Sequence, residues 1–183
     1  MKKLVALAAL MVVVSGCTSM KVAPVDPNTG YFPSQKKGAV VVNKPMDLDA
    51  NKDLIVVANS EFLTGQLRNI NYFGEVITIE ELQKRIIAAG LTDKVPTIQD
   101  RIGLSNAAKY YKPFLWLRFN VRGEQPSQYA QFILTGPATS EDYFLTETKL
   151  DYLWTGVNDQ HNWYPMFNSL IDYIKQNSKT YGR

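Results

Sequence analysis

The sequence predicts a single α/β domain of the α+β kind, in which a mixed sheet of about five strands packs against helices. Short runs rich in β-branched residues alternate with segments in which apolar residues recur every three or four positions. Glycines and capping residues separate these segments, and no internal repeat is visible. About 167 residues follow the apparent leader, a length that fits one domain.

The first half of the domain predicts strands and helices in alternation. The run at 53–58 is apolar on both faces, as in a buried strand. Ser60 can cap the first helix, and Thr78 followed by Glu81 has the spacing of a capping box for the second. The expected elements are strands at 39–42, 53–58 and 75–77 and helices at 60–72 and 78–89.

The second half predicts three longer strands and a final helix. The expected elements are a short helix at 106–111 capped by Ser105, strands at 113–121, 129–135 and 143–154, and a helix at 163–176. Alternation along the first of these strands predicts that one covered face carries Leu115, Leu117, Phe119 and Val121, while Phe114, Trp116, Arg118 and Asn120 face the other way.

The N-terminus has the features of a signal peptide. Lys2 and Lys3 precede an apolar run of about 11 residues, too short to span a bilayer as a permanent helix, and small residues follow it. We therefore expect residues 1–16 to be a signal peptide. Removing its two lysines lowers the net charge from +3 to about +1, and no basic run predicts nucleic-acid binding.

The residues Val14-Ser15-Gly16-Cys17 resemble the bacterial lipobox. The resemblance implies cleavage before Cys17, lipidation of its thiol with palmitate among the acyl chains, and anchoring to a membrane. No aspartate directly follows the cysteine, which by resemblance to enterobacterial lipoproteins implies the outer membrane, facing the periplasm. The alternative is an ordinary secretory signal with a chance cysteine. Cys17 is the only cysteine, so the mature domain has no disulfide.

Residues 17–38 predict the lipidated cysteine and a flexible tether, followed by a globular domain at 39–183. Proline and glycine interrupt a polar stretch without an apolar period. If extended, about 20 such residues reach some 60 to 70 Å. The alternative is an N-terminal arm packed on the domain.

The stretches FLTGQLRNINYFGEVITIEELQKRI at 62–86 and IGLSNAAKYYKPFLWLRF at 102–119 resemble one group of envelope lipoprotein domains. The group includes the curli-secretion lipoprotein, the penicillin-binding-protein activators and the N-terminal domain of the Tol propeller protein. The resemblance covers about residues 50–177, although Ala107-Ala108-Lys109 stands where the group has glycine, alanine and aspartate. It implies a shared fold and an envelope protein as partner.

The sequence contains no recognisable catalytic constellation, metal site or cofactor motif. His161 is the only histidine, in a polar segment without a nucleophile elbow. One histidine cannot supply a zinc cluster, and no glycine-rich phosphate loop occurs. These features predict that the protein is not an enzyme.

Aromatic residues around the polar segment 155–162 predict a partner-binding site, because rings beside hydrogen-bonding groups are typical of interfaces. The candidate contacts are Trp154, Asp159, His161, Trp163 and Tyr164. The alternative is that Trp154 and Trp163 pack the last helix onto the sheet. The sequence thus predicts a lipid-anchored, non-enzymatic binding or assembly module for another envelope protein. The alternative function is a protein that binds or modifies cell-wall glycan.

Overall fold

The computed structural model describes residues 20–34, 36–152 and 157–182, so the predicted signal peptide, Cys17 and Trp154 lie outside the described residues. It confirms a single domain of mixed α and β structure, with a sheet of six strands where the sequence predicted about five. The elements are β1 (Ala39–Asn43), β2 (Leu54–Val57), α2 (Glu61–Asn69), β3 (Glu75–Thr78), α3 (Ile79–Ala88), α4 (Arg101–Tyr110), β4 (Leu115–Arg122), β5 (Tyr129–Gly136), β6 (Glu141–Lys149), the π-helical turn η1 (Asp159–Trp163) and α5 (Tyr164–Asn177).

The sheet combines an antiparallel half with a parallel half, in the order β1-β6-β5-β4-β2-β3. Strands β4, β5, β6 and β1 pair antiparallel, whereas β2 pairs parallel with both β3 and β4. Parallel strands need crossover connections. α2 provides the crossover from β2 to β3, and α3 with α4 return the chain from β3 to β4 on the other side of β2.

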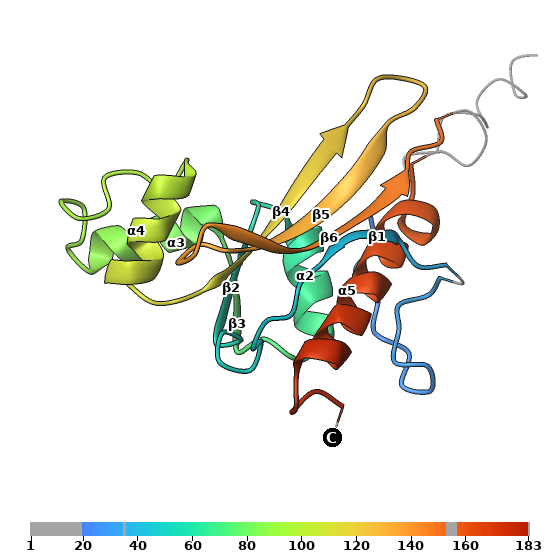
Figure 1. Ribbon diagram of the computed structural model, residues 1–183, viewed down its shortest axis with the longest axis horizontal. Helices are drawn as coiled ribbons and strands as arrows, with labels where there is room; N and C mark the ends of the chain where they lie inside the picture. The colour runs from blue at the N-terminus through green and yellow to red at the C-terminus, as the bar shows by residue number, and fades with distance from the viewer. Residues whose placement is uncertain (1–19, 35, 153–156, 183) are drawn as a thin grey trace, which may run out of the picture.

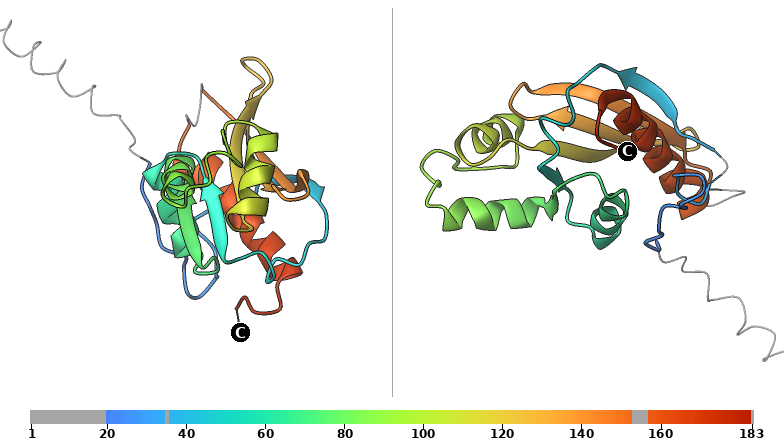
Figure 2. Two further views of the ribbon diagram at one scale, coloured as in Figure 1. Left: turned by 90° about the vertical axis from the view of Figure 1, so that its left-hand side faces the viewer. Right: turned by 90° about the horizontal axis from the view of Figure 1, so that it is seen from below.

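Helices cover the two faces of the sheet unequally (Figures 1 and 2). On one face, α2 and α5 enclose the larger core, which includes Ile55 and Val57 of β2. On the other face, α3 and α4 enclose a smaller core with Leu54 and Val56 of the same strand. This smaller core contains no residue of β5 or β6. Most of β5 and β6 on the sheet face opposite α5 therefore lies outside this core, and α4 reaches these strands through Arg101, which binds Asp142 at the start of β6.

The predicted covered face of the central strand is buried only in the first half of β4. Leu115 and Leu117 are fully buried, but Phe119 and Val121 are 39% and 40% exposed. The second half of β4 extends with β5 as a hairpin that projects from the domain (Figure 1). Its apolar side chains consequently have fewer neighbours.

Residues 20–34 and 36–38, which we call the N-terminal arm, pack against α2 and α5. Phe32 is 1% exposed, and its ring lies 5.9 Å from that of Tyr164 and 5.6 Å from that of Phe167. Residues 20–34 and 36–38 thus follow the alternative of a packed segment in place of a free tether. The predicted domain boundary at residue 39 moves toward the N-terminus, because Phe32 belongs to the core.

Buried polar side chains of the helices hold the backbone of the arm. The amide of Asn168 accepts from the Phe32 N–H at 2.8 Å and donates to the Phe32 carbonyl at 3.1 Å. The Ser169 hydroxyl donates to the Gly38 carbonyl at 2.9 Å. Both side chains are buried and therefore require hydrogen-bond partners from the protein. The arm is accordingly part of the folded domain.

We predict that Phe32→Ala lowers the free energy of unfolding by about 3 to 5 kcal/mol, the usual cost of truncating a buried phenylalanine. Denaturant unfolding followed by circular dichroism measures the change. Lys36→Ala is the matched control in the same arm, because Lys36 is exposed and should change stability by less than about 0.5 kcal/mol. An effect of Phe32→Ala as small as that of the control would show that the arm is not part of the core.

Candidate functional site

The described residues of the predicted binding segment lie where η1 meets α5, beside the arm. Asp159, His161 and Trp163 belong to η1, and Tyr164 is the first residue of α5. Asn158 caps η1, since its side-chain oxygen accepts from the N–H of His161 at 3.0 Å. The structure thus brings four of the five predicted contacts together.

Trp163 packs into the core between α2 and the sheet. It is 7% exposed, and its ring lies 6.0 Å from Phe62 of α2, 5.0 Å from Phe119 of β4 and 6.0 Å from Phe132 of β5. This position corresponds to the alternative in which the tryptophan joins the last helix to the sheet.

Asp159 and Tyr164 both bind the backbone of the arm at Lys21. The Lys21 N–H donates to Oδ2 of Asp159 at 2.8 Å. The Tyr164 hydroxyl donates to the Lys21 carbonyl at 2.9 Å, and burial raises the pKa of Tyr164, which keeps it protonated as a donor. The polar groups of the predicted interface therefore bind the protein's own arm.

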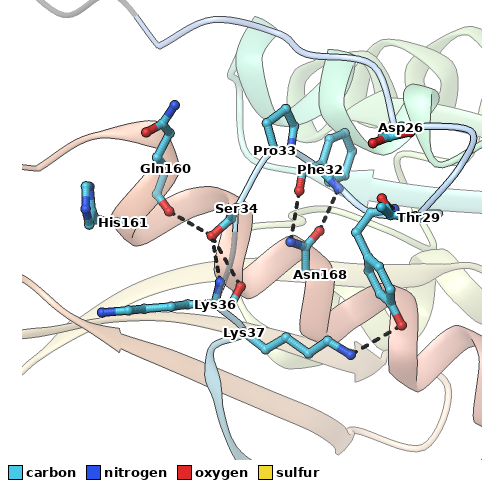
Figure 3. A pocket seen from close by; sticks show the side chains of 11 residues that line it. Asp26, Thr29, Phe32, Pro33, Ser34, Lys36, Lys37, Gln160, His161 and Asn168 are labelled. Atoms are coloured by element: carbon cyan, nitrogen blue, oxygen red, sulfur yellow. Dashed lines mark hydrogen bonds between the residues drawn. The ribbon is translucent and has the colours of Figure 1, made fainter.

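His161 lines a surface pocket of about 710 Å³ between η1 and the arm (Figure 3). Across this pocket the Ser34 hydroxyl donates to the Gln160 carbonyl at 3.0 Å. Nδ1 of the His161 imidazole lies 2.9 Å from the side-chain oxygen of Asn158, within hydrogen-bond distance. Among the described residues that line the pocket, Asp26 is the one carboxylate.

Lys37, one of the two lysines that line the pocket, already contacts neighbouring groups. Lys37 forms an ion pair with Asp172 at 2.5 Å, and this hydrogen bond raises the pKa of Lys37. The Lys37 ammonium also lies 4.4 Å from the centre of the Tyr31 ring, whose hydroxyl donates to the same Asp172. On this side of the pocket, these contacts therefore hold the arm against α5.

A second candidate surface is the uncovered side of the antiparallel strands, which we call the open face. Strand pairing and side-chain alternation place its members on one side of the sheet, opposite α5. The open face comprises Trp116, Arg118, Asn120, Arg122, Tyr129, Gln131, Ile133, Thr135, Asp142, Leu145 and Glu147. Among these, Gln131, Ile133, Thr135 and Glu147 are buried beneath their neighbours, and Trp116 also packs against the smaller core. The sequence placed Trp116, Arg118 and Asn120 together on this side but did not identify it as a site.

One hydrogen-bonded row crosses the open face toward the hairpin end. Arg122 donates two hydrogen bonds to Glu147, at 2.8 and 2.6 Å. Gln131 donates to the same carboxylate at 2.8 Å and accepts from Asn120 at 3.0 Å. The hydrogen bonds from Arg122 hold the pKa of Glu147 below its usual value, so the carboxylate stays charged.

A second row centres on Asp142. Arg118 and the Thr135 hydroxyl each donate to this carboxylate at 2.7 Å, and Arg101 of α4 reaches it at 3.1 Å. Burial alone would raise the pKa of Asp142, but the hydrogen bonds from Thr135 and Arg118 hold it below its usual value.

Both arginines of these rows also stack on aromatic rings. The guanidinium of Arg118 lies 5.1 Å from the ring of Trp116, and that of Arg122 lies 4.4 Å from the ring of Tyr129. Such cation–π contacts fix the orientation of the planar guanidinium groups. The open face is therefore an ordered surface of arginine, aromatic and amide groups.

Neither a metal cluster nor a membrane-spanning helix is found in the part of the chain that the structure describes. No group of three or more His, Cys, Asp or Glu side chains there could hold a metal ion. No helix among the same residues is long and apolar enough to cross a bilayer.

Comparison with known proteins finds similarity only at the level of structure. No family model matches the chain, and no curated protein matches it. The LpoB C-terminal domain from Salmonella enterica is similar over 55% of this chain and 84% of its own, with 12% identity and a TM-score of 0.38. The LpoB C-terminal domain from Escherichia coli is similar over 55% and 83%, with 14% identity and a TM-score of 0.37.

We predict that Trp163→Ala lowers the free energy of unfolding by about 3 to 5 kcal/mol, because it empties a core position. His161→Ala, two residues away and exposed, should change stability by less than about 0.5 kcal/mol. Thermal and denaturant unfolding of the two variants measure the difference. A fully stable Trp163→Ala protein would contradict the core placement.

Proposed function

We propose that this protein is a lipoprotein of the bacterial envelope, anchored through acylated Cys17 to the outer membrane and facing the periplasm. We propose further that it binds or assembles another envelope protein and catalyses no reaction. The lipobox and the preceding signal sequence support the anchor. The open face is the observation that carries the binding role.

The composition of the open face suits a protein partner. Tryptophan, tyrosine and arginine dominate the binding energy of protein interfaces, and Trp116, Tyr129 and the two stacked arginines supply all three types. Their ring contacts and ion pairs fix the side chains in advance, which lowers the conformational entropy lost on binding. Between the two polar rows lie Leu145, which is half-buried, and Ile133, which is buried beneath its neighbours.

The anchor is tested by substitution of the cysteine. Cys17→Ser removes the only thiol, so we expect it to abolish incorporation of labelled palmitate and to leave the protein unprocessed or released from the membrane. Ser15→Ala, which keeps a small residue in the lipobox, is the matched control and should remain labelled. Palmitate labelling that persists in Cys17→Ser would overturn the lipid anchor.

The partner surface is tested by photo-crosslinking in intact cells. A benzoylphenylalanine at position 129 of β5 should give a discrete adduct with an envelope protein, whereas the same residue at position 110 of α4 should not. Both positions are tyrosines, and Tyr110 is exposed at the opposite end of α4 from Arg101, the residue through which α4 reaches the open face. We also expect Tyr129→Ala to weaken binding of the adduct partner by about 2 kcal/mol.

Equal adducts from both positions, or an adduct from position 110 alone, would contradict the assignment of the open face. Sedimentation with purified peptidoglycan provides the remaining comparison. If Tyr129→Ala abolished that sedimentation and no protein adduct formed, the open face would bind glycan in place of a protein.

A further inference from the structure

The docked arm determines how far the domain can stand from its lipid anchor. We propose that in the lipid-anchored protein the arm clamps the domain to the membrane surface, with the end that carries Lys21 and η1 nearest the lipid. The partner would then belong to the same membrane or be bound to it. This inference rests on the proposed acylation of Cys17.

The start of the arm is fixed by groups from two parts of the chain. Asp159 of η1 binds the N–H of Lys21 at 2.8 Å, and Tyr164 of α5 binds its carbonyl at 2.9 Å. Two residues further on, the amide of Asn69 in α2 donates to the Ala23 carbonyl at 2.8 Å. The fully buried amide of Gln66 accepts from the Ala23 N–H at 3.3 Å. The arm is therefore held from Lys21 onward.

Close packing reinforces these hydrogen bonds. Val22 lies so near Gly65 of α2 that a Cβ at this glycine would come within 2.7 Å of the valine side chain. Glycine inside a helix costs about 1 kcal/mol relative to alanine. The glycine at this position leaves room for the Val22 side chain to pack against α2.

Docking shortens the reach from the lipid by several tens of ångströms. Only four residue steps separate Cys17 from Lys21, and four extended residues span at most about 14 Å. A free chain from Cys17 to residue 38 would instead reach about 70 Å. A compact domain of this length is roughly 40 Å across, so its far side lies within roughly 55 Å of the membrane.

The start of the arm also has the side chains expected at a membrane surface. Met20 and Val22 are each about half exposed, at 51% and 48%, and the side chain of Lys21 between them is exposed. Apolar side chains can enter the interfacial region of a bilayer while a lysine keeps its ammonium in water. This end of the domain therefore fits against lipid headgroups.

Energy transfer from two labelled positions to the membrane tests the clamp. The acylated cysteine is no longer a free thiol, so Gln160→Cys in η1 or Ile102→Cys in α4 introduces a single labelling site. Both side chains are exposed, and α4 lies at the end of the molecule opposite the arm (Figures 1 and 2). The full acylated protein is reconstituted in phosphatidylethanolamine–phosphatidylglycerol vesicles that contain an acceptor-labelled lipid.

We expect several-fold stronger transfer from position 160 than from position 102. A 20-residue glycine–serine insertion between residues 19 and 20 preserves every contact of the domain but releases it from the membrane. It should therefore lower transfer from position 160 and remove the difference. Gly65→Leu should displace Val22 from α2. It should therefore also reduce the difference in energy transfer between positions 160 and 102.

Equal transfer from the two positions, or a difference that the insertion leaves unchanged, would overturn the clamp alone. Flotation of the vesicles separates this failure from a failure of the proposed function. If the unaltered protein did not float with vesicles, the lipid anchor would be overturned, and the clamp with it.

Discussion

The backbone of the N-terminal arm satisfies polar side chains that α2 and α5 bury. Gln66, Asn168 and Ser169 are almost fully buried, and their hydrogen bonds go to the arm at residues 23, 32 and 38. A buried polar group without a partner costs about 1 to 3 kcal/mol. The helices and the arm therefore depend on each other, and the position of the arm sets the direction in which the chain leaves the domain.

The regular elements could be predicted from the sequence because their signals are local. Ser60 and Thr78 cap their helices as expected, since each accepts from the N–H three residues later. The helix expected at 106–111 instead begins at Arg101, because the side chain of Asp100 binds the N–H of Gly103 at 2.7 Å. The N-cap of α4 is therefore Asp100 and not Ser105.

The arm and the binding segment could not be predicted because their determinants are distant in the sequence. Proline and glycine between residues 24 and 33 have the composition of a linker, and the chain there is ordered by distant groups such as Asn168, 136 positions after Phe32, and Asp172. The types of residue in η1 are equally suited to an external partner and to the protein's own backbone. Alternation along β4 identified the covered face but not that its cover ends after Leu117, because the alternation continues unchanged into the projecting hairpin.

Two arginines of the open face already form ion pairs within the domain. This pairing limits how much these charges can add to the affinity for a partner. Arg122 with Glu147 and Arg118 with Asp142 already satisfy each other, so a partner need not neutralise a lone charge. Burying such pairs yields little net affinity, because desolvation offsets their attraction. The affinity would therefore come from the rings of Trp116 and Tyr129, and the fixed guanidinium groups would select a surface whose hydrogen-bond acceptors match them.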